Sequence, residues 1–269
     1  MKRLAILVSG NGTNMENLIL KNKGGVFPAE IVFVLTDNPE AKAIEKAKKL
    51  GVPVMIVPRK NYANRSDFER EVTHYLESKQ IDYILLAGFM RILSPAFVKR
   101  YPDRMINIHP SLLPQFPGAQ GIQDAFEAKV KETGVTVHYV TEEVDGGPIY
   151  LKRPLSLYGS AEEIFLRASG IIEEMIVEIL ERNPKPVPQQ GEPTPFKRRR
   201  PEESNLASAS SLDQLFDMIR MLDAEGYPNA FLEFGPFRLE FTRAALKEDQ
   251  VIADVRIKLS KNAKERDRS

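Results

Sequence analysis

Short apolar runs alternate with amphipathic stretches along the first half of the chain. The apolar runs are continuous, which is typical of parallel strands in a sheet that is covered on both faces. The stretches between them carry apolar residues at helical spacing. Strands are predicted at 4–9, 31–36, 52–58, 82–88 and 105–109, and helices through residue 20 and at 40–50, 67–79 and 95–100. This order predicts an α/β fold with a doubly wound, mostly parallel sheet.

Two further apolar runs, at 135–140 and 149–157, predict additional strands, in the antiparallel sense. A long amphipathic helix is predicted over 161–182, with Ser160 as its N-cap. We therefore expect the first domain to end with this helix.

The pattern changes at residue 183. Residues 183–196 hold five prolines, which exclude a regular helix and predict an extended linker. A helical stripe from Leu212 to Leu222 and several β-like runs follow, which predict a small α+β or β-barrel-like domain. The predicted divisions are a catalytic domain at 1–182, a proline-rich linker at 183–200, a C-terminal domain at 201–260 and a disordered tail at 261–269.

The amino-acid composition excludes some classes of function. The chain has 38 Lys and Arg against 37 Asp and Glu, a formal charge of +1, so a broad nucleic-acid-binding surface is not expected. The KRRR run at 197–200 is either a phosphate contact or a solvated linker end. No apolar run is long enough to span a membrane, and there is no cysteine. No pair of His or Cys residues has the spacing of a metal site. These features together predict a cytoplasmic enzyme without a metal site.

The turn GNGTN, at 10–14, lies between the first predicted strand and the first helix. Glycines permit a tight turn there, and a helix N-terminus offers free N–H groups to an anion. The turn is either a phosphate site or a purely structural feature.

A denser cluster of polar residues follows the strand at 105–109. Asn107 and His109 are two positions apart, so their side chains leave the same face of the strand, at the sheet edge where α/β folds bind ligands. An amide beside an imidazole can stabilise an oxyanion and move a proton. If Asp145, in the turn EEVDGGP, lies beside His109, it would raise the pKa of the imidazole. His138 is interpreted as structural and His74 as solvated.

Four motifs carry a family resemblance over residues 1–150. They are SGNGTN at 9–14, LAGFMRILSPAFV at 86–98, NIHPSLLPQFPG at 107–118 and GVTVHYVTEEVDGGPI at 134–149. In this order they closely resemble the glycinamide ribonucleotide (phosphoribosylglycinamide) formyltransferases of purine biosynthesis. The resemblance implies the formyltransferase fold and a folate-dependent enzyme that transfers a formyl group from 10-formyltetrahydrofolate to a substrate amine, without a metal.

The resemblance also implies the site residues. The catalytic positions are Asn107, His109 and Asp145, and the substrate-phosphate positions are Gly12, Thr13 and Asn14. Pro114 is expected to follow a cis peptide bond. The folate positions are Arg65, Met90, Arg91, Ile92, Leu93, Thr141, Glu142, Glu143, Val144 and Asp145.

Some segments depart from this family. Gln120 stands where the family has a histidine, and RASGIIEEM at 167–175 replaces its ribose-binding motif. Beyond residue 149 the chain resembles methionyl-tRNA formyltransferase-like and amino-sugar N-formyltransferases. The two resemblances together are compatible with a natural mosaic, a fusion or an engineered hybrid. The expected partner is a small phosphorylated amine, with glycinamide ribonucleotide first, and the expected state is a monomer or homodimer. The alternatives are a nucleotide-linked amino sugar, an aminoacyl-tRNA, and a catalytically silent binding module.

Overall fold

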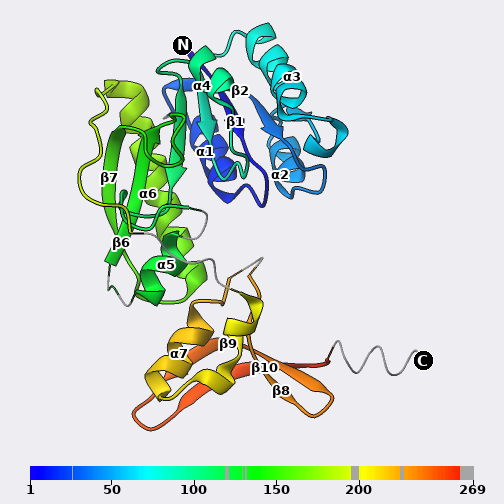
Figure 1. The fold of residues 1–269 in the computed structure, drawn as a ribbon, viewed down its shortest axis with the longest axis vertical. Helices are drawn as coiled ribbons and strands as arrows, with labels where there is room; N and C mark the ends of the chain where they lie inside the picture. The colour runs from blue at the N-terminus through cyan, green and yellow to red at the C-terminus, as the bar shows by residue number, and fades with distance from the viewer. Residues whose placement is uncertain are drawn as a thin grey trace. The chain divides into compact units, whose positions relative to one another are not determined.

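The fold is seen in a computed structural model, which describes residues 1–25, 27–118, 121–128, 130, 132–194, 200–224 and 227–260 (Figure 1). The predicted tail at 261–269 and most of the KRRR run lie outside the described residues. The chain forms two compact units. The first comprises residues 1–125, 132–155 and 168–196, and the second comprises residues 126–131, 156–167 and 197–269.

A seven-stranded sheet with the order β3-β2-β1-β4-β5-β6-β7 forms the centre of the first unit. Neighbouring strands from β3 to β5 are parallel, while β6 is antiparallel to β5. This confirms the predicted mostly parallel sheet. The strands are β1 (Lys2–Leu7), β2 (Ala29–Thr36), β3 (Val54–Ile56), β4 (Tyr83–Leu86), β5 (Met105–His109), β6 (Glu132–Tyr139) and β7 (Ile149–Ser156).

Helices cover the sheet and bury its apolar strands. One core cluster joins alternate strand residues, such as Leu7 and Leu35, to Phe68 of α3 and Phe97 of α4. Arg153 of β7 pairs with two glutamates of α6, Glu174 and Glu178. The helices are α1 (Thr13–Lys23), α2 (Ala43–Lys49), α3 (Arg65–Ser78), α4 (Pro95–Arg100), α5 (Gly121–Glu127) and α6 (Ala161–Arg182), with a 3₁₀ turn at Arg59–Asn61.

Local hydrogen bonds explain where α6 begins. The amide of Glu163 donates to Ser160 Oγ at 3.3 Å, and the amide of Ser160 donates to the Glu163 carboxylate at 2.7 Å. This reciprocal capping box satisfies two amides and confirms Ser160 as the N-cap. Within the described part of the chain, no helix has the length and apolar character needed to cross a membrane.

The strand order reverses between β1 and β4, which places a topological switch point there. The turn after β1 and the loop after β4 meet at this point, because the amide of Ser9 donates to the carbonyl of Gly88 at 3.0 Å. Open α/β sheets bind ligands in the crevice at such a point. The GNGTN turn and the loop at 88–94 therefore lie at the edge where a ligand is expected.

The second unit contains a three-stranded antiparallel sheet with the order β10-β9-β8, and α7 packs against it. Its small core joins Leu206, Ile219, Leu222 and Ala230. This is an α+β arrangement, as the sequence predicts. Its elements are α7 (Leu212–Arg220), β8 (Ala230–Phe234), β9 (Phe237–Leu246) and β10 (Val251–Leu259), preceded by 3₁₀ turns at Pro201–Ser204 and Leu206–Ser208.

Candidate active site

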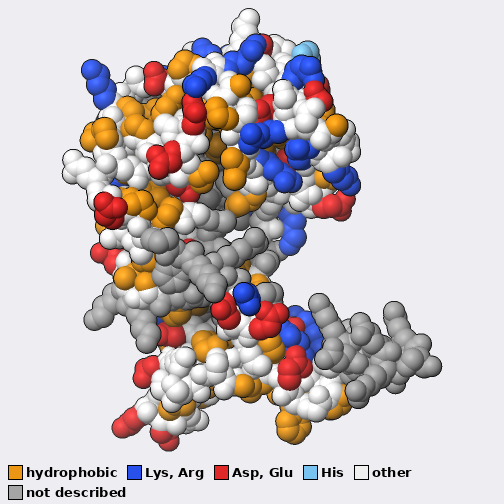
Figure 2. Space-filling model, viewed as in Figure 1, with side chains coloured by type: hydrophobic (Ala, Val, Ile, Leu, Met, Phe, Trp, Pro, Cys, Tyr) orange, Lys and Arg blue, Asp and Glu red, His pale blue; other side chains and the backbone are white. Residues whose placement is uncertain are grey.

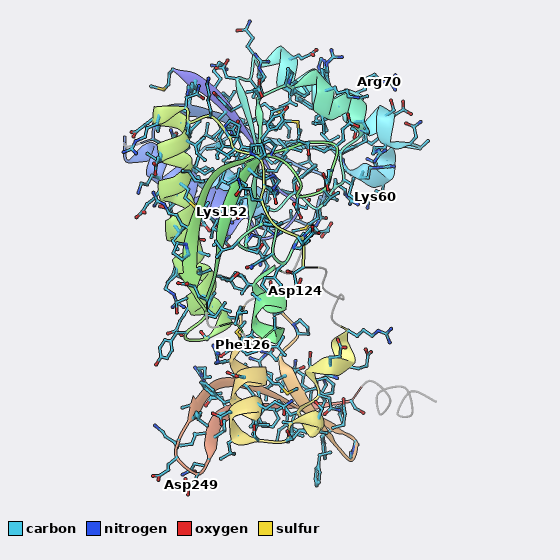
Figure 3. The ribbon with its side chains drawn as sticks, turned by 60° about the vertical axis from the view of Figure 1, so that its left-hand side comes forward. Lys60, Arg70, Asp124, Phe126, Lys152 and Asp249 are labelled. Carbon is cyan, nitrogen blue, oxygen red and sulfur yellow. The ribbon has the colours of Figure 1, made fainter. Side chains whose placement is uncertain are left out.

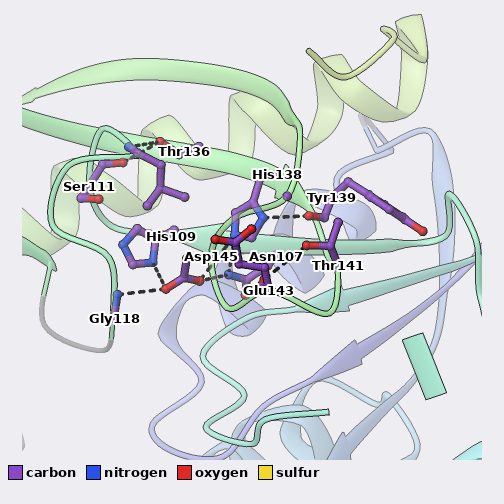
Figure 4. Close-up of polar contacts among 12 residues, drawn as sticks. Asn107, His109, Ser111, Gly118, Thr136, His138, Tyr139, Thr141, Glu143 and Asp145 are labelled. Carbon is purple, nitrogen blue, oxygen red and sulfur yellow. Dashed lines mark hydrogen bonds and ion pairs between the residues drawn. The ribbon is translucent and has the colours of Figure 1, made fainter. Parts of the chain in front are cut away.

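Antiparallel pairing of β5 with β6 determines which polar side chains meet at the end of β5. In this register Asn107 lies opposite His138, and His109 lies opposite Thr136. Residues directly opposite each other point to the same face. The Asn107 amide nitrogen is 3.0 Å from His138 Nε2 (Figure 4). His109 and His138 are both buried.

Asp145 lies among these side chains, in the loop between β6 and β7. Its Oδ2 atom lies 3.6 Å from His109 Nδ1 and accepts a hydrogen bond of 2.9 Å from the Gly118 amide. Its Oδ1 atom lies 3.6 Å from His138 Nε2 and 3.5 Å from the Asn107 amide nitrogen (Figure 4). The structure thus brings Asn107, His109 and Asp145 together and adds His138 to them.

Backbone carbonyls orient both imidazole rings. His109 Nε2 lies 2.9 Å from the Phe116 carbonyl oxygen, and His138 Nδ1 lies 2.9 Å from the Tyr139 carbonyl oxygen. A carbonyl only accepts hydrogen bonds, so these ring nitrogens carry hydrogen. The other nitrogen of His109, Nδ1, is directed toward Asp145. A proton taken up at Nδ1 would therefore lie against a carboxylate.

Burial and charge act against each other in this cluster. Burial lowers the pKa of His109 below its usual value; Asp145 and the Phe116 carbonyl oppose this shift, and His138 adds to it. The sequence predicts that Asp145 raises the pKa of His109. The contact with Asp145 does have this effect, but burial outweighs it, so the pKa of His109 is lowered overall. For Asp145, burial raises the pKa, but His138, His109 and the Gly118 amide together lower it below the ordinary value. The free site therefore favours a neutral His109 beside an ionised Asp145 at neutral pH.

The loop at 110–118 forms one wall of the cluster and is held by several side chains. Thr136 Oγ1 donates to the Ser111 carbonyl at 2.6 Å and accepts from the Leu113 amide at 3.0 Å. Lys152 of β7, labelled in Figure 3, donates to the Leu113 carbonyl. The peptide bond before Pro114 is cis, as predicted. Gln120 lies outside the described residues.

The GNGTN turn places the first turn of α1 at the same edge of the sheet. Gly12 has φ +69°, and a Cβ atom there would lie 2.7 Å from the Cβ of Ala43, so glycine is required. Gly12 is the N-cap of α1 and offers no side-chain cap to its amides. Thr13 is exposed, while Asn14 Oδ1 accepts a hydrogen bond of 2.8 Å from Ser169 Oγ of α6. Uncapped amides at this position can bind an anion.

The predicted folate positions lie in three places. Arg65 is exposed at the start of α3, and Val144 is exposed beside Asp145. In the loop after β4, Met90 and Ile92 are exposed, whereas Leu93 is buried in the core. Arg91 pairs with the buried Asp37. In the loop after β6, Thr141 Oγ1 donates to the Glu143 carbonyl at 3.2 Å, and Glu142 pairs with Lys99 at 2.8 Å.

This arrangement suits acyl transfer between two small molecules. An amide can donate to a developing oxyanion, and an imidazole backed by a carboxylate can accept and return a proton. The exposed apolar side chains of Met90 and Ile92 offer a surface to a flat ring. The chain has no cysteine, which excludes a thioester intermediate.

Comparison with known proteins identifies the family. Residues 2–162 match the formyl transferase family, and residues 201–258 match the methionyl-tRNA formyltransferase C-terminal domain. The first match covers more than half of the chain, so the chain belongs to the formyl transferase family. It is a folate-dependent formyltransferase.

Relatives of two kinds match the chain, and they cover different shares of it. Phosphoribosylglycinamide formyltransferase from Haemophilus influenzae is 40% identical over 169 residues, which is 62% of this chain and 80% of that protein. The crystal structure of phosphoribosylglycinamide formyltransferase from Bacillus halodurans is 40% identical, with a TM-score of 0.63 over 68% of this chain and 95% of that chain. Methionyl-tRNA formyltransferase from Clostridium thermocellum is 30% identical, with a TM-score of 0.73 over 97% of this chain and 100% of that chain.

Sequence reasoning missed two members of the site. His138 was interpreted as structural, but its Nε2 atom lies within reach of Asn107 and Asp145. Gln189, in the predicted linker, donates to the carbonyls of Asp145 and Gly147. The alternation of β6 places His138 on the same face as Thr136, but only the register with β5 puts that face beside Asn107. No sequence signal indicated Gln189.

Proposed function

We propose that this enzyme transfers the formyl group of 10-formyltetrahydrofolate to the amine of glycinamide ribonucleotide. The observation that carries the proposal is the Gly12 turn, which presents uncapped α1 amides at the sheet edge that also holds Asn107, His109 and Asp145. A phosphorylated acceptor requires an anion site at the edge where its amine reacts. Relatives that match residues of this unit are named phosphoribosylglycinamide formyltransferase.

The proposed chemistry uses the cluster directly. A neutral acceptor amine attacks the formyl carbon, one carbon–nitrogen bond forms, and the bond to the folate nitrogen breaks. Asn107 donates to the oxyanion that develops on the formyl oxygen. His109, neutral in the free site, accepts the proton that the amine loses and returns it to the leaving nitrogen. Asp145 stabilises the transient imidazolium from 3.6 Å.

The donor folate is proposed to occupy the surface made by the loops after β4 and β6. Met90, Ile92 and Val144 expose apolar side chains there. Arg65 and Arg91 supply positive charge that suits the carboxylates of a folate tail. The buried Leu93 would contribute through its backbone and through support of the loop.

A second candidate acceptor is a nucleotide-linked amino sugar, or an aminoacyl group on tRNA. The observations that favour it are the match of residues 201–258 to the methionyl-tRNA formyltransferase C-terminal domain and the similarity of 97% of the chain to a methionyl-tRNA formyltransferase structure. Acidic and basic side chains both occur on the face in Figure 2, which favours a small acceptor over tRNA.

The test is an acceptor screen with 10-formyltetrahydrofolate as the donor. The acceptors are glycinamide ribonucleotide, several nucleotide-linked amino sugars and methionyl-tRNA, and product formation is followed by release of tetrahydrofolate. We expect turnover with glycinamide ribonucleotide and loss of turnover in His109→Ala, with folate binding retained. Turnover with an amino sugar alone would replace the proposed acceptor. Folate binding without turnover on any of these acceptors would contradict both the proposed acceptor and the second candidate.

A further inference from the structure

The 183–194 segment, predicted as a linker, lies against both loops that form the catalytic cluster. It enters beside β7, where the backbone of Val187 exchanges two hydrogen bonds, of 2.7 and 2.9 Å, with that of Ile149. It leaves beside the loop at 110–118, where Thr194 forms a β-bridge with Gln115. The segment therefore contacts the start of β7 near one end and the loop at 110–118 near the other.

Between these two contacts, Gln189 reaches the loop that carries Asp145. Its side-chain amide nitrogen donates to the Asp145 carbonyl at 2.6 Å and to the Gly147 carbonyl at 2.9 Å. Gln189 is half-buried, whereas its neighbour Gln190 is exposed. One amide group thus fixes the backbone on both sides of Gly146.

The backbone at Asp145 needs such support. Asp145 has φ +55°, in the left-handed region that residues with a side chain rarely adopt. Gly147 follows in a close backbone approach, because a Cβ atom there would lie 1.7 Å from the Tyr139 carbonyl oxygen, so the loop must keep a specific backbone path. The Asp145 carboxylate must also remain between His109 and His138.

The far end of the segment supports the opposite wall. The Gln115 carbonyl, next to the Thr194 bridge, accepts a hydrogen bond of 2.6 Å from Ser111 Oγ. The following residue, Phe116, supplies the carbonyl that accepts from His109 Nε2. The segment is therefore linked by short chains of contacts to both groups that orient His109, namely Asp145 and Phe116.

We propose that Gln189 is a positioning residue for formyl transfer, and that the 183–194 segment holds Asp145 and His109 in their working geometry. This inference rests on the proposed function only in assigning His109 and Asp145 to catalysis. Without the two hydrogen bonds from Gln189, the Asp145 loop relaxes and its carboxylate moves away from His109. The Gln189 side chain donates to the Asp145 loop and not to the GNGTN turn, so the KM for the acceptor should change less than kcat.

The experiment compares Gln189→Leu with Gln190→Leu in the full-length chain. Gln189→Leu keeps the approximate size of the side chain and removes its donor, and Gln190→Leu makes the same change at the exposed neighbour. We expect at least a tenfold loss of kcat in Gln189→Leu with a change below threefold in the KM for the acceptor, and no change in Gln190→Leu. Gln189→Glu, which keeps the shape of the side chain, is the second variant should Gln189→Leu fold poorly.

A second readout does not depend on any acceptor. The chain has three histidines, so an NMR titration of their ring protons can be assigned with His109→Asn and His138→Asn. Asp145 and His138 are the titratable groups that face His109. Loss of Gln189 should lower the pKa of His109, because the carboxylate that raises it moves away.

The two readouts separate the possible failures. A lowered pKa of His109 without turnover on any acceptor would support the positioning role and contradict the proposed function. An unchanged pKa and an unchanged kcat in an active Gln189→Leu protein would overturn the positioning role. Equal losses in Gln189→Leu and Gln190→Leu would also overturn it.

Discussion

Asp37, which follows β2, forms an ion pair with Arg91, 54 positions further along the chain in the loop after β4. The Asp37 side chain is 1% exposed and the Arg91 side chain is 46% exposed. The other carboxylate oxygen of Asp37 accepts from Ser9 Oγ at 2.6 Å, and the Met90 amide donates to that same hydroxyl at 2.8 Å. One buried carboxylate thus joins the strand ends that border the switch point.

Asp37→Asn should loosen the loop after β4. The amide retains one acceptor but loses the charge that holds Arg91, and we expect a loss of about 1–3 kcal/mol in the free energy of unfolding. If this loop binds folate, the KM for 10-formyltetrahydrofolate should rise several-fold, and kcat should change less. The measurements are urea unfolding and steady-state kinetics. Glu40→Gln, at an exposed position in the loop after β2, is the control and should leave both quantities unchanged.

Asp145→Asn should fold and lose most of its turnover. The substitution is nearly isosteric and removes the negative charge 3.6 Å from His109 Nδ1. Without that charge the pKa of His109 falls further, and the imidazolium that forms during proton transfer loses its stabilisation. We expect kcat to fall by about 10²–10⁴-fold, the usual range for general acid–base groups. Kinetics that match the wild type across the pH range would remove Asp145 from the mechanism.

Stability should depend on pH through His109. Its folded-state pKa lies below the unfolded value of about 6.5, so the unfolded chain binds more protons below that pH. Stability is therefore fully present above about pH 6.5 and is lost as the pH falls below it, by at most about 1.4 kcal/mol per pH unit for one proton. Urea unfolding of His109→Asn between pH 7 and 5 should show a weaker pH dependence.

Gly12→Ala should damage the GNGTN turn at 10–14. A Cβ atom at this position would lie 2.7 Å from the Cβ and 3.0 Å from the Cα of Ala43, and φ is +69°. The left-handed backbone alone costs about 1–3 kcal/mol for a residue with a side chain. We expect lower stability and, if this turn binds the phosphate of the proposed acceptor, a raised KM for glycinamide ribonucleotide. Gly10→Ala is the control, because a Cβ atom there meets nothing within 4 Å; equal effects of the two changes would contradict the steric argument.

Strong local patterns made much of the fold predictable. The predicted strand at 105–109 and the helix at 161–182 have the observed bounds, because a continuous apolar run and a capping serine are local signals. Helix α5 (Gly121–Glu127) was not predicted, since seven residues carry little periodicity. The place of His138 in the cluster depends on the register of β5 with β6, which single-strand patterns do not encode.

The 183–194 segment marks another limit of sequence reasoning. Its prolines correctly exclude a regular helix, but they do not indicate which surface the extended chain follows. That surface is specified by Val187, Gln189 and Thr194, whose partners lie 38 or more positions earlier in the chain. Such long-range contacts leave no pattern within the segment itself.

The second unit has a consequence for how this protein could have evolved. It combines residues 197–269 with two earlier segments, 126–131 and 156–167. Arg220 of α7 donates to the carbonyls of Leu157 and Gly159 at 2.8 and 2.6 Å, and the Glu162 amide donates to the Asp223 carbonyl at 3.2 Å. A single recombination event at residue 197 would separate these partners. Exchange of the C-terminal part between relatives would therefore succeed only where the donor and recipient share the 156–167 surface, or where that segment is inherited together with the C-terminal part.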